Sequence, residues 1–219
     1  MSDWYRRKSW SPSDEQEFFA KLGRARKDGR AQYLRAQAVE LIETKDLKLL
    51  SVAEGLLNKM LADYPDNRLE KALAFSELGY IYELRGDHNA ALNYYKQAID
   101  FEEVFPNVIT GSVLQYAELG VKHGRRDLFV EIFQLLVGRM SGLAFPIEKY
   151  LANSLLAVIC LENKDYDQAQ RYATIAERNA NAETSGLRNH KDLGLVKERD
   201  SFFESALKEL TRSRTNETL

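Results

Sequence analysis

Only four prolines interrupt the 219 residues, and three of them are almost evenly spaced. Pro65, Pro106 and Pro146 are separated by 41 and 40 residues. Because proline ends helices and rarely occurs inside them, the long stretches between these positions are expected to be helical. Four is also a low count, since proline usually makes up about 5% of a chain. The spacing predicts a helical chain built from repeated units.

Apolar residues recur at helical spacing along most of the chain, and no segment alternates as a strand would. A helix is expected at each end, over 11–28 and 196–212. Ser11 can cap the first of these and Pro12 suits its first position. Between the two ends the pattern predicts pairs of helices with short breaks, over 31–44 and 47–63, 68–85 and 88–103, 107–123 and 127–140, and 146–162 and 166–180.

The second pair has the most regular pattern of residues. Gly79 and Ala91 are small where its two helices would cross, so the backbones can approach closely, and Gly86-Asp87 supplies the turn. The full pattern is Phe75-x-x-Leu78-Gly79-x-x-Tyr82, then Gly86-Asp87, then Ala91-x-x-x-Tyr95-x-x-Ala98. This unit resembles the tetratricopeptide repeat. The other pairs are more diverged, and in the third Phe129, Phe133 and Leu136 replace the small residues expected near position 130.

The resemblance covers about residues 31–183 and implies an all-α fold. Since a single hairpin cannot bury its own apolar face, hairpins stack and need capping at both ends. We expect an α-solenoid of four hairpins, a tetratricopeptide-like right-handed superhelix with N- and C-terminal capping helices. The expected parts are an arm at 1–10, a capping helix at 11–30, hairpins at 31–66, 67–105, 106–145 and 146–183, a linker and capping helix at 184–212, and a flexible tail at 213–219.

Charge and cysteine content favour a cytoplasmic protein that binds neither nucleic acid nor membrane. The chain has 31 basic and 33 acidic residues and a net charge of -2, so no global field attracts nucleic acid. No signal peptide or run of 18 apolar residues is visible. The single Cys160 lies in an apolar run and is interpreted as a buried hydrophobic residue.

The search for catalytic, cofactor-binding or metal-binding residues finds none. The three histidines, at 88, 123 and 190, lack metal-ligand spacing. The pair Glu102-Glu103 is interpreted as a solvated helix end and not as a carboxylate dyad. No nucleophile elbow, CxxC motif or phosphate-binding glycine loop is present. An enzyme with an unrecognised site between hairpins remains as an alternative, but no residues support it.

In the repeat the first helix of each hairpin lines an inner groove, and its residues not used for packing can face a ligand. Tyr80 is the strongest candidate because an aromatic ring gives a large contact area, although it could instead pack on the neighbouring hairpin. Arg35 could hold a carboxylate. The full groove set is Arg35, Val39, Ser76, Tyr80, Leu114, Glu118, Lys122, Ser154 and Val158.

Some members of the family bind the acidic C-terminal tails of heat-shock chaperones through Lys and Asn. The corresponding positions here hold Arg35, Val39, Glu77 and Leu155, so the resemblance does not imply that activity. The leading hypothesis is a non-catalytic scaffold or adaptor for a protein or peptide. The alternatives are an immunity or antitoxin-like protein that sequesters a toxin domain, and a regulator that senses a short peptide.

Two further contacts are expected, one from the N-terminal arm and one from the third hairpin. The arm at 1–10 carries Trp4, Tyr5 and Trp10 among three cations. The tryptophans are expected to pin the arm to the body, or the arm itself is captured by a partner. The bulky third hairpin could expose Phe129 or Phe133 to a second copy, which gives a possible homodimer.

Overall fold

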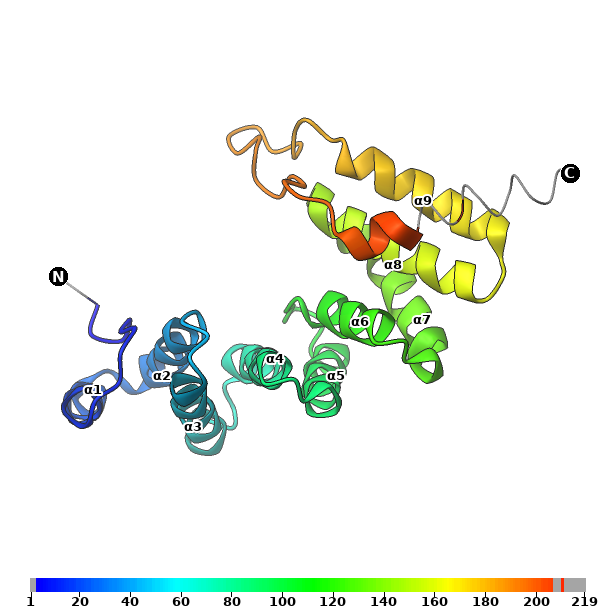
Figure 1. Ribbon diagram of the computed structural model, residues 1–219. Helices are drawn as coiled ribbons and strands as arrows, with labels where there is room; N and C mark the ends of the chain where they lie inside the picture. Colours follow the sequence, from blue (N-terminus) through cyan, green and yellow to red (C-terminus); the bar gives the residue numbers. More distant parts are fainter. Residues whose placement is uncertain (1–2, 207–209, 211–219) are drawn as a thin grey trace, which may run out of the picture. The chain divides into compact units, whose positions relative to one another are not determined.

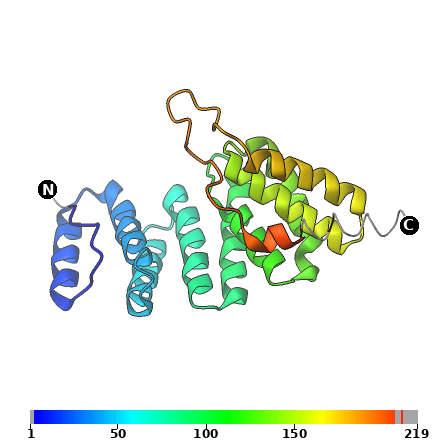
Figure 2. The same ribbon diagram turned by 45° about the horizontal axis from the view of Figure 1, so that its top comes forward.

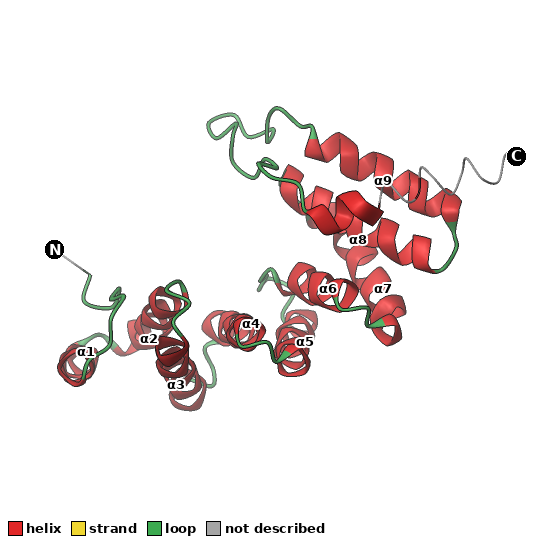
Figure 3. Cartoon of the chain, viewed as in Figure 1, coloured by secondary structure: helices red, strands yellow, loops and turns green. Residues whose placement is uncertain are grey.

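A computed structural model describes residues 3–206 and 210. Over these residues the chain forms helices joined by turns and loops, and no strand (Figure 3). The predicted all-helical fold is therefore confirmed. The chain divides into two compact units, Met1–Ser112 and Val113–Leu219. None of the described helices is long and apolar enough to cross a bilayer.

The unit Met1–Ser112 is a row of helices in which successive pairs form hairpins. Helices α2 and α3 pack closely along their lengths, as do α4 and α5, and α4 also contacts α2 and α3 (Figure 2). Adjacent helices are therefore joined both within and between hairpins. In chain order (Figure 1) the helices are α1 (Pro12–Arg24), α2 (Lys27–Ile42), α3 (Leu47–Asp63), α4 (Arg68–Leu84) and α5 (His88–Val104).

Side-chain caps fix where most of these helices begin. Ser11 and Asp14 form a capping box at the start of α1, as the sequence predicts. Asp46 caps α3, Asn67 caps α4 and Asp87 caps α5. Because each cap satisfies amide groups that the helix leaves unpaired, these boundaries are determined by local sequence.

The junction between α1 and α2 differs from the prediction. Helix α1 ends at Arg24, and α2 begins at Lys27, so Asp28-Gly29 lies in the first turn of α2 and does not end α1. The cause is the side chain of Arg30, which donates from Nη2 to the carbonyl of Gly23 at 2.6 Å and from Nε to that of Ala25 at 3.0 Å. This contact supplies the partners for the last carbonyl groups of α1.

The α4–α5 hairpin depends on a close crossing at Gly79. A Cβ atom on Gly79 would lie 2.5 Å from the ring of Tyr95, which is itself fully buried. Tyr95 Oη donates to Glu83 at 2.7 Å and so ties α5 back to α4. The hairpin is linked to α3 in turn, because Tyr82 and Arg85 both donate to the carboxylate of Glu54.

The unit Val113–Leu219 contains the third and fourth hairpins. Short 3₁₀ turns flank α7 on both sides, and the chain from 181 to 200 forms no helix. Residues 201–206 are helical again and pack on the last hairpin (Figure 1). The helices are α6 (Ser112–Lys122), α7 (Phe129–Arg139), α8 (Pro146–Glu162) and α9 (Tyr166–Ala180).

Two predictions about the region after α5 are wrong. Helix α6 starts at Ser112 and not at 107. Glu102, which the sequence places at a solvated helix end, is only 3% exposed. Its Oε1 accepts hydrogen bonds from the backbone N and the Oγ1 of Thr110, at 2.7 and 2.5 Å. This carboxylate therefore fixes the loop between the second and third hairpins.

The third hairpin also has a small residue where its two helices cross. This residue lies on the first helix, α6, and not on the second helix, where the sequence predicts it. A Cβ on Gly120 of α6 would lie 2.7 Å from Ile132 Cδ1 of α7. Leu119-Gly120 repeats Leu78-Gly79, 41 residues later, a correspondence that a search near position 130 misses. A glycine on the first helix thus accommodates the bulky residues of the second.

The last predicted helix, over 196–212, begins later than expected, at Ser201. Asp200 Oδ1 accepts a hydrogen bond from the backbone N of Phe202 at 2.9 Å, so Asp200 caps this helix. The remainder of the predicted range, at 207–209 and 211–212, lies outside the described residues, as does the predicted tail at 213–219.

The crossing at Gly79 yields a stability prediction. Gly79→Ala is expected to lower the free energy of unfolding by about 1–3 kcal/mol, because the buried Tyr95 ring cannot move away. Chemical denaturation of the variant and the unmodified chain measures this change in the free energy of unfolding.

Gly55→Ala is the matched control, since Gly55 lies in the middle of α3 with open space around its Cα. That change should stabilise the chain by about 0.5–1 kcal/mol through helix propensity. Equal effects of the two substitutions would contradict the close crossing.

Candidate functional site

The first candidate site is the face that α2 and α4 share, where two groove residues of each helix were expected. Arg35 lies there, with its guanidinium between two carboxylates. Its Nη1 donates to Glu77 Oε1 at 2.5 Å, and its Nε donates to Glu70. Arg35 therefore already holds two carboxylates of the chain itself, and whether it also binds a partner's carboxylate stays a prediction.

Glu77 is the unusual member of this cluster. Its Oε2 is buried and has no hydrogen-bond partner among the described residues. Burial raises the pKa of Glu77 to about 7, although the neighbouring Arg35 acts to lower it. A buried carboxylate oxygen without a donor is costly, so this position suits a ligand that donates a hydrogen bond, such as a backbone N–H or a cationic side chain.

The other groove residues of this unit surround the cluster. Ser76 precedes Glu77 in α4, and Tyr80 lies one turn further along the same helix. Val39 lies one turn after Arg35 in α2. All three are partly exposed, and Tyr80 also packs against the buried core. The structure thus brings Arg35, Val39, Ser76 and Tyr80 onto neighbouring helices.

The predicted groove residues of the unit Val113–Leu219 are mostly engaged or buried. Lys122 Nζ lies 2.6 Å from Glu118 Oε1 and 2.6 Å from Asp200 Oδ2. Burial would lower the pKa of Lys122, but the hydrogen bonds to Asp200 and Glu118 outweigh this effect and raise it. Ser154 is fully buried and Val158 is 7% exposed, while Leu114 is partly exposed. Asp200 of the chain itself therefore pairs with a residue of this face.

The N-terminal arm packs on the body, as expected for its tryptophans. Trp4 contacts Phe18 and Tyr33, with ring centroids 5.3 and 5.1 Å apart, and Trp10 contacts Phe18 at 5.4 Å. The cations of the arm are paired as well: Arg6 with Glu40, Arg7 with Asp14 and Glu17, and Lys8 with Glu43. Carboxylates of the chain itself therefore neutralise the cations that a nucleic acid would otherwise contact.

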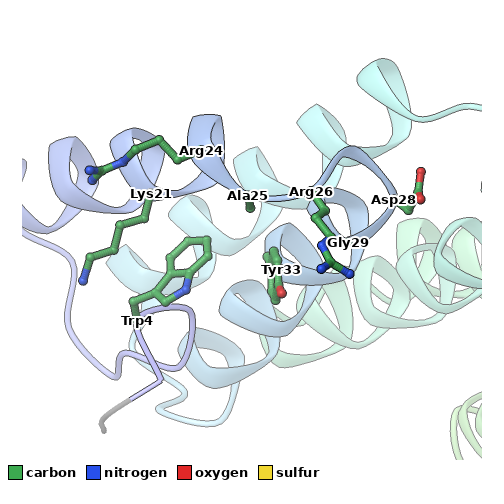
Figure 4. Close-up of a pocket in the computed structure, with 8 residues that line it drawn as sticks. All are labelled: Trp4, Lys21, Arg24, Ala25, Arg26, Asp28, Gly29 and Tyr33. Atoms are coloured by element: carbon green, nitrogen blue, oxygen red, sulfur yellow. The ribbon is translucent and has the colours of Figure 1, made fainter.

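A hollow of about 620 Å³ lies beside the arm at the α1–α2 junction (Figure 4). Trp4 and Tyr33 provide two aromatic rings, and the side chain of Arg26 forms no ion pair within the described part of the chain. Cations outnumber the one carboxylate, so the hollow favours a planar or anionic group. Its lining is Trp4, Lys21, Arg24, Ala25, Arg26, Asp28, Gly29 and Tyr33. The sequence analysis missed this hollow, and the excess of cations over residues 21–30 was the available signal.

The third hairpin exposes less than the sequence predicts. Phe129 is only 5% exposed, and Phe133 packs edge-on against Tyr172 of α9 with ring centroids 6.1 Å apart. Val130, at 71%, and Val137, at 47%, are the exposed large hydrophobic residues of this helix. Cys160 is buried as predicted, and burial raises its pKa to about 11. At neutral pH it is a protonated thiol of low reactivity.

Over residues 3–206 and 210, no group of three or more His, Cys, Asp or Glu side chains converges as a metal site would require. Of the histidines, 123 and 190 are exposed, and 88 is partly exposed in the first turn of α5.

Comparison with known proteins identifies one repeat in the chain. Residues 69–104 match the family model of the tetratricopeptide repeat. These residues are the α4–α5 hairpin with its crossing at Gly79. No curated protein and no solved structure matches the chain. The second hairpin of the chain is therefore similar to a tetratricopeptide repeat.

The raised pKa of Glu77 predicts how stability depends on pH. The folded chain holds this proton more tightly than the unfolded chain, whose carboxyl has the ordinary value of 4.5. The stabilisation is therefore complete below about pH 4 and is lost as the pH rises towards 7. From pH 5 to 8 this group should lower the free energy of unfolding by about 1–3 kcal/mol.

Urea denaturation across this pH range measures the effect. Glu77→Gln should flatten the dependence, because the amide does not titrate. Glu103→Gln is the control, since Glu103 is an exposed carboxylate on α5. If Glu77→Gln and Glu103→Gln leave the same slope as the unmodified chain, Glu77 does not titrate in this range.

Proposed function

We propose that the chain is a non-catalytic scaffold that binds a protein or peptide on the face shared by α2 and α4. The observation that carries this proposal is the tetratricopeptide hairpin at 69–104, since this repeat typically mediates protein interactions. A repeat array offers an extended surface of first helices to its ligand. The two helices of this face are the first helices of the first two hairpins.

The chemistry of this face fits a peptide. Tyr80 provides an aromatic surface that is partly exposed, and aromatic residues carry much of the binding energy in interfaces. Beside it, Glu77 Oε2 lacks a donor. A peptide that places an N–H or a cationic side chain at this oxygen would satisfy a buried acceptor while covering Tyr80. The bound segment is therefore expected to carry a Lys, an Arg or an exposed backbone amide at this point.

The experiment begins with affinity purification from the native cell and mass spectrometry, followed by calorimetry with the purified partner. Tyr80→Ala is expected to weaken binding about tenfold or more, as the loss of an interface anchor does. Val39→Lys should weaken binding as well, because it places a positive charge on the face where the cation or amide donor of the ligand is expected.

Ile175→Ala is the matched control, since this side chain is 44% exposed on α9. It should leave the affinity unchanged. If Tyr80→Ala and Val39→Lys bind the partner as tightly as the unmodified chain, this face is not the binding surface. Recovery of the chain with a bound small molecule and no protein would contradict the scaffold function itself.

A further inference from the structure

The junction between α1 and α2, at residues 21–30, carries a concentration of positive charge. It holds five cations and one carboxylate, a local net charge of +4 in a chain whose net charge is -2. The cations are Lys21, Arg24, Arg26, Lys27 and Arg30, and the carboxylate is Asp28. Because like charges this close to one another repel, a bound anion would relieve the repulsion.

Most of this charge is not neutralised within the fold. Arg24, Arg26 and Lys27 form no ion pair within the part of the chain that the structure describes. Arg30 donates to two backbone carbonyl groups, which leave its charge in place. Lys21 is paired, at 2.6 Å from a carboxylate oxygen of α1. The cations of the N-terminal arm, by comparison, are all paired. The charge available to a ligand is therefore at the junction and not in the arm.

Two aromatic rings line the hollow beside these cations. The ring of Trp4 lies against that of Tyr33, with centroids 5.1 Å apart, and both side chains are partly exposed. Gly29 leaves room for the Tyr33 ring at the first turn of α2, since a Cβ there would lie 3.2 Å from Tyr33 Cε2. Trp4 also packs on Phe18, with centroids 5.3 Å apart. The rings are thus fixed before a ligand arrives, which lowers the entropic cost of binding.

Cations lie on both sides of the rings (Figure 4). Lys21 and Arg24 project from α1 on one side of the Trp4 ring. Arg26 lies on the other side, beyond Tyr33. A complementary ligand therefore has an apolar planar group at its centre and negative charge before and after it.

The hollow is open and suits a segment of a protein better than a small molecule. A small-molecule site normally encloses most of its ligand. Here none of the eight residues that line the hollow is buried, although its volume is about 620 Å³. A peptide needs less enclosure, because one anchoring side chain and a few charged contacts can carry much of its binding.

We propose that the α1–α2 junction binds an acidic segment of a partner protein in which an aromatic residue lies between Asp or Glu residues. The aromatic side chain packs against Trp4 and Tyr33, and the carboxylates on its two sides pair with Arg24 and Arg26. Asp28 opposes such a ligand, but it is one negative charge among five positive ones. The inference goes beyond the proposed function, because it uses none of the residues assigned to the α2–α4 face.

Fluorescence anisotropy with the labelled peptide EDEFEDE tests the proposal on the full chain. Arg24→Glu combined with Arg26→Glu should weaken binding about tenfold or more, because two charges are reversed at the site. Arg171→Glu combined with Arg178→Glu is the matched control, since both arginines are exposed on α9 and the net charge changes equally. This control should bind within about twofold of the unmodified chain, since salt screens distant charges. Equal losses in the two double variants, or no binding by the unmodified chain, would overturn the proposal.

Asp28→Asn gives a prediction of the opposite sign. Removal of the one carboxylate in the hollow should tighten binding of EDEFEDE about threefold, the size expected for an exposed charge pair. The basic peptide KKKFKKK should bind more weakly than EDEFEDE to the unmodified chain, since it carries the same charge as the junction. Weaker binding of EDEFEDE by Asp28→Asn, or preference of the unmodified chain for KKKFKKK, would overturn the proposal.

The tryptophans of the chain report directly on the rings. There are two of them, so Trp10→Phe leaves Trp4 as the single tryptophan. In this variant EDEFEDE should shift the emission of Trp4 to shorter wavelengths and protect it from acrylamide, because the aromatic side chain excludes water from the ring. The peptide EDEAEDE should bind about fivefold or more weakly, since it lacks the aromatic anchor. Equal affinity of the two peptides, or unchanged Trp4 emission with EDEFEDE bound, would overturn the contact with the rings.

Two further results separate this surface from other assignments. Tyr80→Ala should leave the affinity for EDEFEDE unchanged, so failure of the α2–α4 surface and failure of this one are distinguishable. Single-stranded oligothymidine also combines negative charge with groups that stack on aromatic rings. Tighter binding of oligothymidine than of EDEFEDE, with the same change in Trp4 emission, would assign the junction to nucleic acid and overturn the assignment to a protein segment.

Discussion

The close approach of α4 and α5 at Gly79 is the contact on which the candidate surface depends. With no Cβ in the way, the ring of Tyr95 lies directly against the backbone of α4, and its hydroxyl group bonds to Glu83 on the same helix. This contact fixes the rotation of α4, so Glu77 and Arg35 meet and Tyr80 stays partly exposed. In the third hairpin, Gly120 of α6 allows a similarly close approach of Ile132 of α7.

Much of the fold could be predicted because it depends on local sequence. Ser11 caps α1, Pro146 opens α8, and the turn at Gly86-Asp87 joins α4 to α5. Errors arise where a side chain distant from the boundary supplies the missing hydrogen bonds. Arg30 ends α1 early, and Glu102 holds the loop that delays α6 until Ser112. Neither contact has a signal in helical periodicity.

The site was harder to predict because its electrostatics depend on long-range contacts. Arg35 is taken by Glu70 and Glu77, which follow it by 35 and 42 residues. Lys122 is paired with Asp200, 78 residues away. Projection of a repeat pattern places such cations on a face but says nothing of their partners. Tyr80 is partly exposed on α4 and also packs against the core, and its part in binding stays a prediction.

Photo-crosslinking tests the central claim most directly. A photoreactive phenylalanine analogue at position 80 would report what lies against α4 in the complex, and the same analogue at position 175 on α9 serves as the reference. The account predicts that the partner crosslinks at position 80 and not at 175. Crosslinking at 175 alone, with an intact complex, would contradict the claim that α2 and α4 form the binding surface.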